Sequence, residues 1–542
     1  MENSKDFNLE SDMEAQIQKL IEGIKNNPDF VFVKNLIDKK PEAEVYLVGG
    51  AVRDALLGKE IKDYDFVVTG IEKKELEEFL KNYGEVKDVD SRSFGVFKFV
   101  PKGYQGEPID VALPRKERQT GLGYKDFKIE SSAKLGIDDD LARRDLTINA
   151  IAINLKNGLL VDKFGGLKDI KEGIIRAVGN PEERFAEDPS RILRAIRLAC
   201  QMSFQIEPKT LESAKKLASE ITKNFKDKEN HEKSRVASET VAAEFLKGLV
   251  KDPVRLIELY DQTGVLAQIL PELSVLKGVE QPAQFHSEGD VWEHTILTLK
   301  NLKPDADINL KLAALFHDIG KPLTQKTPEK HGTDRIRFHE HASEGADIFK
   351  RIFDRLKLSA PFAKNNSSFY ADRKKIIWLI KNHMICTGTK PEQMRSGTIE
   401  KYFFGKRGER TKRGKHLLEL SKADISATIL PTGESDFTAL NNLGKRINEV
   451  EDILKKQAGK EKLAKKIPLI LDGHSVQKVF KIKPGPAVGR IKDLIRYLQL
   501  EGELKTVDDV REKKSLIQKS AQENKKTEKS VKRYFELKEQ EE

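Results

Sequence analysis

Residues 49–66 read GGAVRDALLGKEIKDYDF, and this stretch decides the fold of the region around it. The apolar run EVYLV just before it predicts a buried strand, and Gly49 and Gly50 predict a tight turn. AVRDALL then predicts a helix that stops at the next glycine. Backbone N–H groups at a helix N-terminus behind such a turn bind anions, and Arg53 adds a cation in the first helical turn. The stretch therefore predicts an anion site.

The second half of the stretch, DYDFVV, predicts the next strand. Successive side chains of a strand point to opposite faces, so we expect Asp63 and Asp65 to share one face, opposite Tyr64. Two carboxylates on one face repel each other unless a cation lies between them. Beside a phosphate site, the natural cation is Mg²⁺ that contacts both carboxylates and a triphosphate. An isolated Asp-x-Asp more often lies on a solvated strand edge, and the glycine turn is what favours the functional interpretation.

The composition limits the class of protein. With 542 residues, the chain is long enough for about three or four domains. Its formal net charge of +10 favours a polyanionic partner such as RNA, although a solvated lysine-rich surface gives the same number. Only two cysteines are present, which excludes a disulfide framework and favours the cytoplasm. No apolar run approaches the roughly 20 residues of a membrane span, and the acidic N-terminus is not a secretory signal.

The pattern along the chain predicts an α+β fold. Short β-like runs alternate with helical stretches up to about residue 178, and helical periodicity dominates afterwards. We expect a head with a mixed β-sheet, an all-α neck and body, an all-α histidine-rich domain and a helical C-terminal module. The expected boundaries are a polar helical leader at 1–43, the head at 44–178, the neck and body at 179–280, the histidine-rich domain at 281–430, the C-terminal module at 431–510 and a charged helix or disordered tail at 511–542.

Several motifs together resemble one family. LVGGAVRDALLG with KDYDFVV, RRDLTINAIAIN at 143–154 and EDPSRILRAIRLA at 187–199 resemble the motifs of the class II tRNA nucleotidyltransferase and bacterial poly(A) polymerase family, and within it the CCA-adding enzymes. The resemblance runs from about residue 44 to about 510. It implies that Asp63 and Asp65 hold Mg²⁺, that an RNA 3′-hydroxyl attacks the α-phosphate of CTP or ATP, and that pyrophosphate leaves.

The same resemblance implies further site residues in the head. Asp110, in PIDVALPRKE, matches a third carboxylate of the metal site; otherwise it is a solvated strand end. The stretch 117–127 matches a flexible loop that helps the enzyme change between nucleotides. Arg143, Arg144 and Asp145 would meet the sugar and the triphosphate, since a carboxylate can accept a hydrogen bond from the ribose 2′-OH. An ordinary ion pair at a helix start is the alternative interpretation of these three residues.

Asp188 and Arg191 are three residues apart, and on a helix they would share a face. A carboxylate accepts from the exocyclic amine of cytosine or adenine and a guanidinium donates to the adjacent ring nitrogen, whereas uracil and guanine oppose both groups. This pair would therefore select C and A without a template, as the family does. Asp188 before proline is also a typical helix N-cap, and it can serve both roles if one oxygen stays free. Arg194 and Arg197 continue the stripe and are expected to hold phosphates.

The histidine-rich region resembles an HD-domain metal phosphohydrolase. The resemblance implies six ligands for a divalent transition metal, Mn²⁺, Ni²⁺, Co²⁺ or Fe²⁺: His294, His317, Asp318, His341, His383 and Asp424. Related CCA-adding enzymes with this domain imply phosphatase and cyclic phosphodiesterase activity. His286, His331 and His339 have no motif role.

The function expected from these motifs is repair of the CCA end of tRNA from CTP and ATP. The shared motifs do not separate this activity from CC-, A- or poly(A)-addition. A phosphohydrolase with an RNA-binding head is a rival of another class, and a non-enzymatic RNA-binding protein is a third possibility. The expected partner is tRNA, with no DNA and no membrane, and the chain is either a monomer or a dimer.

Overall fold

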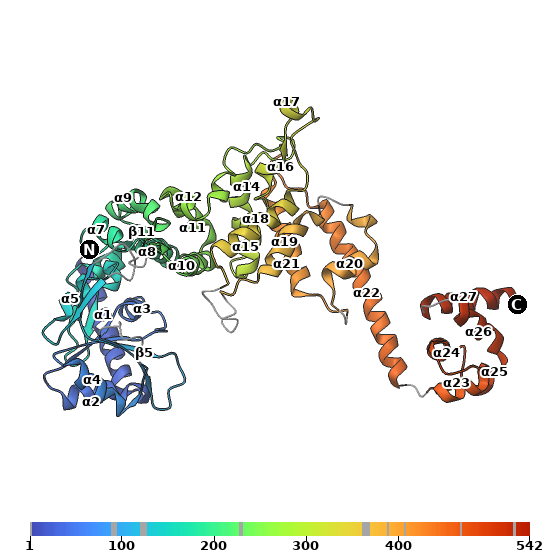
Figure 1. The fold of residues 1–542 in the computed structure, drawn as a ribbon, viewed down its shortest axis with the longest axis horizontal. Helices are drawn as coiled ribbons and strands as arrows, with labels where there is room; N and C mark the ends of the chain where they lie inside the picture. The colour runs from blue at the N-terminus through green and yellow to red at the C-terminus, as the bar shows by residue number, and fades with distance from the viewer. Residues whose placement is uncertain are drawn as a thin grey trace. The chain divides into compact units, whose positions relative to one another are not determined.

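The protein forms two compact units, Met1–Met384 with Glu419–Asp436, and Ile385–Leu418 with Phe437–Glu542. The computed structural model describes residues 3–87, 95–119, 127–226, 231–359, 369–386, 390–405, 408–466, 469–523 and 527–541. None of the described helices is both long enough and apolar enough to cross a membrane. The head, drawn in blue and cyan in Figure 1, carries the mixed sheet, and most of the remaining chain is helical. The predicted α+β class is confirmed.

A seven-stranded sheet in the order β3-β4-β5-β2-β1-β8-β9 organises the head. Its described neighbours pair antiparallel except β2 and β5, which are parallel. Two more strands, β6 and β7, form a separate hairpin. The strands span Glu44–Val48 (β1), Asp65–Thr69 (β2), Gly84–Lys87 (β3), Val96–Pro101 (β4), Ile109–Ala112 (β5), Arg115–Gln119 (β6), Phe127–Ser131 (β7), Ala152–Asn154 (β8) and Leu160–Val161 (β9).

The two faces of this sheet bury different clusters. Val45 and Leu47 of β1 pack with the N-terminal helices, while Tyr46 and Val48 pack with helix α5 on the other face. This period-2 alternation is the reason why the EVYLV run is apolar throughout. The first face is covered by α1 (Asn3–Asn26), α2 (Val31–Lys39) and α4 (Lys73–Lys81), and the second by α5 (Ile137–Ala142). The predicted leader is therefore helical and packs on the head.

Helices make up most of the rest of the first unit. The bounds near the head are Pro181–Glu187 (α7), Ser190–Met202 (α8), Pro208–Leu217 (α9), Ser238–Lys251 (α10), Pro253–Gln262 (α11) and Val265–Ile269 (α12). The histidine-rich region adds Val291–Lys300 (α14), Ile308–Phe316 (α15), His341–Arg355 (α18), Arg373–Asn382 (α19) and Lys412–Ala427 (α21). Two short hairpins, Asn224–Lys226 with Glu232–Ser234 and Gln325–Lys326 with Arg337–Phe338, interrupt the helices. Strands of two or three residues are too short to show alternation, so the sequence did not predict them.

The second unit is helical in its described residues and has its own core. Its helices span Ser396–Phe403 (α20), Thr438–Lys466 (α22), Gly473–Phe480 (α23), Pro486–Leu500 (α24), Val507–Glu512 (α25), Lys514–Glu523 (α26) and Thr527–Glu541 (α27). Ile517 and Tyr534 of the last two helices are buried with Leu494 of α24. The region expected to be a charged helix or a disordered tail is therefore helical where it is described, and it packs on the C-terminal module.

Candidate functional sites

The turn between β1 and helix α3 (Gly50–Leu56) allows other segments to approach closely. Gly49 has a φ of 71°, a left-handed conformation that favours glycine. A Cβ at Gly49 would lie 2.7 Å from Arg144 Nη1 and 3.6 Å from Asp65 Oδ2. Arg53 folds back over the turn, with Nη2 3.5 Å from where a Cβ of Gly50 would lie. The turn thus gathers a carboxylate and two guanidinium groups.

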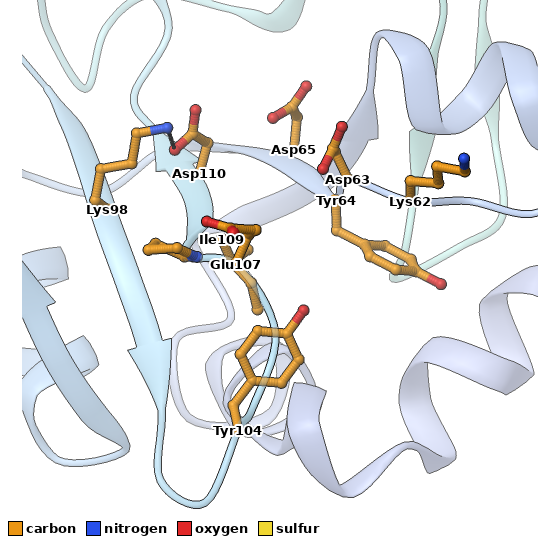
Figure 2. Close-up of a pocket in the computed structure, with 10 residues that line it drawn as sticks. Lys62, Asp63, Tyr64, Asp65, Lys98, Tyr104, Glu107, Ile109 and Asp110 are labelled. Carbon is orange, nitrogen blue, oxygen red and sulfur yellow. Dashed lines mark ion pairs between the residues drawn. The ribbon is translucent and has the colours of Figure 1, made fainter. Parts of the chain in front are cut away.

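Three carboxylates converge beside this turn. The parallel pairing of β2 with β5 places Asp65 opposite Asp110, and Asp63 lies just before β2 rather than within it. Figure 2 shows all three carboxylates on one side of the strands, with Tyr64 directed away from them, as the alternation predicted. They line a cavity of about 550 Å³ together with Lys62, Tyr64, Lys98, Tyr104, Glu107, Pro108 and Ile109.

The carboxylates need compensating charge. Burial and the neighbouring Asp110 carboxylate raise the pKa of Asp65, while Arg144 lowers it. Lys98 Nζ lies 2.5 Å from Asp110 Oδ1, and this buried oxygen makes no hydrogen bond of good geometry. An under-coordinated buried oxygen among three carboxylates fits a hard divalent cation such as Mg²⁺.

Arg143 and Arg144 are both anchored on one carboxylate that the sequence did not single out. Asp140 is fully buried, with Oδ1 2.9 Å from Arg143 Nε and Oδ2 2.9 Å from Arg144 Nη2. Burial would raise the pKa of Asp140, but the two guanidinium groups outweigh it and the pKa is lowered. Both arginines therefore form ion pairs, as the alternative interpretation expected. The ion pair with Asp140 also holds Arg144 beside Gly49.

Asp145 and Asn149 connect the head motifs to helix α8. Asp145 is buried, and its Oδ2 accepts from Arg194 Nε at 2.7 Å, which outweighs burial and lowers the pKa of Asp145. Asn149 Nδ2 donates to Asp145 Oδ1 at 3.2 Å, and its Oδ1 accepts from Arg53 Nη1 at 2.7 Å. Its backbone oxygen accepts from Arg144 Nη1 at 3.3 Å. Sequence analysis missed this asparagine because only the short 3₁₀ turn Thr147–Asn149 brings it back to Asp145.

Asp188 lies between α7 and α8. Its Oδ1 accepts from the backbone N–H of Ser190 at 2.9 Å, so the capping contact exists, although Pro189 occupies the N-cap and the helix begins at Ser190. Among the described residues, Asp188 Oδ2 accepts no hydrogen bond. One oxygen is thus free, as a second role requires.

Arg191 is buried next to Asp188 and does not pair with it. Its Nη1 lies 3.0 Å from Glu187 Oε2, and its Nη2 lies 3.3 Å from the backbone oxygen of Arg143. Arg184 Nη1 also contacts Glu187 Oε2 at 3.0 Å. Glu187 and Arg184 are therefore positioning residues that the sequence did not reveal, because their choice of partner depends on how α7 and α8 meet.

The two later arginines of α8 differ. Arg194 pairs with Asp145 and remains partly exposed. Arg197 Nε lies 2.5 Å from Glu244 of α10, and its Nη1 donates to Gln201 at 2.6 Å. Arg197 thus joins α8 to α10, and these contacts give no support to the expected phosphate role. Residues 120–126 of the expected nucleotide-switching loop lie outside the described residues; β6 and β7 flank them.

The structure brings all six predicted HD residues together. They come from α14 (His294), the segment after α15 (His317 and Asp318), the start of α18 (His341), the end of α19 (His383) and α21 (Asp424). Asp318 is shared by two groups, one with His294 and His317 and one with His341 and His383. His294 Nε2 lies 3.0 Å from Asp424 Oδ1, and His341 Nε2 lies 3.2 Å from His383 Nε2.

These residues fit a divalent transition metal. His317 Nε2 and Asp318 Oδ2 are buried, lie 3.1 Å apart and make no hydrogen bond of good geometry. Burial and the neighbouring imidazoles lower the pKa of His383 to about 3, which favours its neutral form, whereas hydrogen bonds to Asp424 and Glu288 outweigh burial and raise the pKa of His294 to about 9. His294 therefore has to lose a proton when it binds a metal. Lys321 Nζ, 2.6 Å from Asp318 Oδ2, compensates part of the negative charge. Imidazole and carboxylate donors suit Mn²⁺, Ni²⁺, Co²⁺ or Fe²⁺.

Comparison with known proteins gives independent matches to both regions. The family of the Poly A polymerase head domain matches residues 45–176, and the HD domain matches residues 291–422. The Multifunctional CCA protein of Alkalilimnicola ehrlichii is 36% identical over 321 residues, which cover 58% of this chain and 70% of that protein. The protein of the same name from Neisseria gonorrhoeae is 39% identical over 320 residues, with the same coverage. A crystal structure of the Bacillus stearothermophilus CCA-adding enzyme in complex with CTP is 21% identical, covers 89% of this chain and 95% of that one, and has a TM-score of 0.49.

Proposed function

The chain is a nucleotidyltransferase of the multifunctional CCA protein family, and we propose that it restores the CCA end of tRNA from CTP and ATP, releasing pyrophosphate. Identity of 36% and 39% to two proteins with that name supports the proposal. The observation that carries it is the convergence of three carboxylates on one cavity, with the glycine turn and Arg144 close to one of them, Asp65.

In this proposal Asp63, Asp65 and Asp110 hold Mg²⁺, which when bound stabilises negative charge on the triphosphate. The N–H group of Gly50 is offered to the triphosphate, since backbone donors behind a glycine turn bind phosphate oxygens, whereas the N–H of Gly49 donates to the oxygen of Ile151 at 3.4 Å. Arg53 and Arg144, which lie beside the turn, supply cations there, and the same role is assigned to Arg143, which is anchored with Arg144 on Asp140.

Nucleotide selection is assigned to residues on either side of the head–neck boundary. Asp145 has three of its roughly four acceptor sites occupied by Leu146, Asn149 and Arg194, which leaves one for a ribose hydroxyl. Asp188 offers its free Oδ2 to the amine of cytosine or adenine. Arg191, held by Glu187, donates to the adjacent ring nitrogen. Arg194 links the base-reading helix to Asp145.

The proposed domains follow the motifs: the head at 44–178, the neck and body at 179–280, the HD domain at 281–430 and a C-terminal module at 431–510 that contributes to tRNA binding. We propose the cytoplasm as the compartment, because both cysteines are free thiols.

Nucleotide incorporation tests the main proposal. Purified protein is incubated with tRNA that ends before CCA, with tRNA that ends in CC and with an unrelated RNA, each with labelled CTP, ATP or both. CCA addition predicts two C residues and then one A on the first substrate, and one A on the second. Addition of C alone, of A alone or of an A tail assigns the chain to a CC-adding, A-adding or poly(A)-adding group. No incorporation from any nucleotide refutes the proposal.

The second proposed function is a metal-dependent phosphohydrolase in the HD domain. The observation that favours it is the cluster of five buried ligand-type side chains and the partly buried Asp424, with His317 Nε2 and Asp318 Oδ2 under-coordinated. Hydrolysis of a 2′,3′-cyclic nucleotide and of a nucleoside monophosphate, with each of the four metals and after chelation, tests it. Activity that needs no metal refutes it.

A further inference from the structure

The four imidazoles of the HD site differ in what holds their Nδ1 atom. In three of them Nδ1 lies 2.7 to 2.8 Å from a backbone carbonyl oxygen: His317 on Ala314, His341 on Phe338 and His383 on Ile380. In the fourth, His294, Nδ1 lies 2.9 Å from a carboxylate oxygen, Oε1 of Glu288. A charged acceptor makes a metal-binding imidazole a stronger ligand than a neutral acceptor does. His294 therefore differs in electronic character from the other three.

Glu288 is built into the protein and does not lie on its surface. Its side chain is 0% exposed, and its carboxylate meets three donors. Oε1 also contacts His286 Nδ1 at 2.6 Å, and Oε2 accepts the backbone N–H of Ile429 at 2.8 Å. The contact accounts for His286, a residue to which the motifs gave no role.

These contacts connect Glu288 to a second candidate ligand. Ile429 follows α21, which carries Asp424, and the N–H of Ser287 donates to the oxygen of Ile429 at 2.7 Å. Two hydrogen bonds therefore fix the end of α21 against the segment that precedes α14. Asp424 Oδ1 lies 3.0 Å from His294 Nε2 as a result. Glu288 thus acts on both residues of one half of the site and makes no contact with His341 or His383.

We propose that Glu288 is a positioning residue that sets the metal affinity of the half of the HD site containing His294 and Asp424, and that it leaves the half containing His341 and His383 unchanged. The inference rests on the proposed metal site. An Nδ1–H of His294 directed at the Glu288 carboxylate would leave Nε2 as the nitrogen that binds a metal. Glu288 also holds Asp424 within reach of the same metal.

The variant Glu288→Gln tests this with little change of shape. A carboxylamide has one acceptor oxygen, whereas the carboxylate has two, so at least one of the three donors from His286, His294 and Ile429 meets an N–H group. Loss of such an outer partner typically weakens metal affinity about 10- to 100-fold. Glu288→Asp keeps the charge but moves it back by one methylene, so we expect a smaller loss. Glu244→Gln, a change of another buried carboxylate that pairs with Arg197 instead, is the matched control.

The experiment is a Mn²⁺ titration of the metal-free full-length chain, followed by calorimetry and by electron paramagnetic resonance, with melting temperatures as a check of folding. We expect two Mn²⁺ in the HD site of the wild-type chain, one for each of the two ligand groups that share Asp318, and in Glu288→Gln a 10- to 100-fold weaker affinity for one of them only. Glu244→Gln keeps both affinities. The inference is refuted if Glu288→Gln binds Mn²⁺ as tightly as the wild type does, or if both positions are weakened equally. Either result would leave the proposed HD metal site itself unaffected. A wild-type chain that binds no Mn²⁺ refutes the site and the inference together. If Glu288→Gln does not fold, Glu288→Asp decides by the same criterion.

Discussion

The head site and the HD site contain similar chemical groups in opposite surroundings. In the head, Asp63 is exposed and Asp65 and Asp110 are partly exposed, and their cavity already contains Lys98 as a counter-charge. In the HD domain, five of the six candidate ligands are buried and Asp424 is partly buried. An open carboxylate site suits a cation that arrives with a charged substrate, whereas a buried imidazole site suits a metal that stays. The contrast teaches that burial and donor type would keep the two proposed metal chemistries of this chain apart.

The strongest test of this separation removes a carboxylate from the head. Asp63→Ala or Asp65→Ala should lower incorporation of CTP and ATP by about a thousandfold or more, since metal-based charge stabilisation contributes several kcal/mol. Affinity for tRNA should remain, because phosphate contacts dominate RNA binding. Incorporation kinetics and filter binding measure both quantities.

The control is Glu107→Ala, which removes an exposed acid from the same cavity and should cost little. Near-normal turnover of either aspartate variant would contradict the assignment of the site. Loss of Mn²⁺ from the HD site in these variants would break the comparison itself.

The reciprocal test removes a buried ligand. His317→Ala or Asp318→Ala should lower transition-metal affinity at least about a hundredfold, because loss of a direct ligand costs more than loss of an outer partner. Asp318→Ala should affect both metal positions, since both ligand groups include it. Metal analysis and phosphatase assays measure the loss, and nucleotide addition should stay within about twofold. A folded variant that lost both activities would show that the sites are coupled.

Sequence analysis predicted the head site better than its surroundings. Alternation along DYDFVV places both aspartates on one side, and the family resemblance singled out Asp110, which lies opposite Asp65 in the sheet. The partners of the charged groups were not predictable. Glu187 holds Arg191, and Asp140 holds two arginines, because of how separate elements pack, and no local pattern encodes that choice. In the HD domain the candidate ligands follow from the resemblance to HD proteins, whereas Glu288 lies in an irregular segment that has no periodicity.

The next prediction concerns the selection of the nucleotide base by Asp188. Asp188→Ala should reduce discrimination of CTP against UTP about 10- to 100-fold, because a hydrogen bond to a charged group contributes about 1.5–3 kcal/mol. A role as a helix cap alone predicts instead about 1 kcal/mol of lost stability with unchanged preference. Measuring kcat/KM for the four nucleotides beside the melting temperature separates the two. If the ratio of kcat/KM for CTP to that for UTP is unchanged, Asp188 does not read the base, and its role is limited to the hydrogen bond with the N–H of Ser190.

The smallest expected effect concerns the network that joins the head motifs. Asn149→Leu removes the acceptor of Arg53 and a donor to Asp145, so KM for CTP and ATP should rise about three- to tenfold, with a smaller change in kcat. Preference for ribonucleotides over deoxyribonucleotides should fall with it, because Asp145 loses one of its restraints. Asn154→Leu is the control: the side chain of this buried asparagine bonds the backbone N–H groups of Lys156 and Asn157 and the Tyr46 side chain, and makes no hydrogen bond with Arg53 or Asp145. An equal rise of KM in both variants would mean that Asn149 matters for folding alone.

Lys98 has a consequence for how the head reaches its folded state. Three carboxylates on one face would oppose assembly of β2 against β5, and the ammonium group 2.5 Å from Asp110 offsets part of that repulsion without any bound ion. The lysine is thus an internal counter-ion of the head, present before any nucleotide or metal ion. If Mg²⁺ binds Asp110 as proposed, it has to displace this lysine. Folding of the head would then be independent of metal supply, and its affinity for the free ion would be lowered until a triphosphate arrives with it.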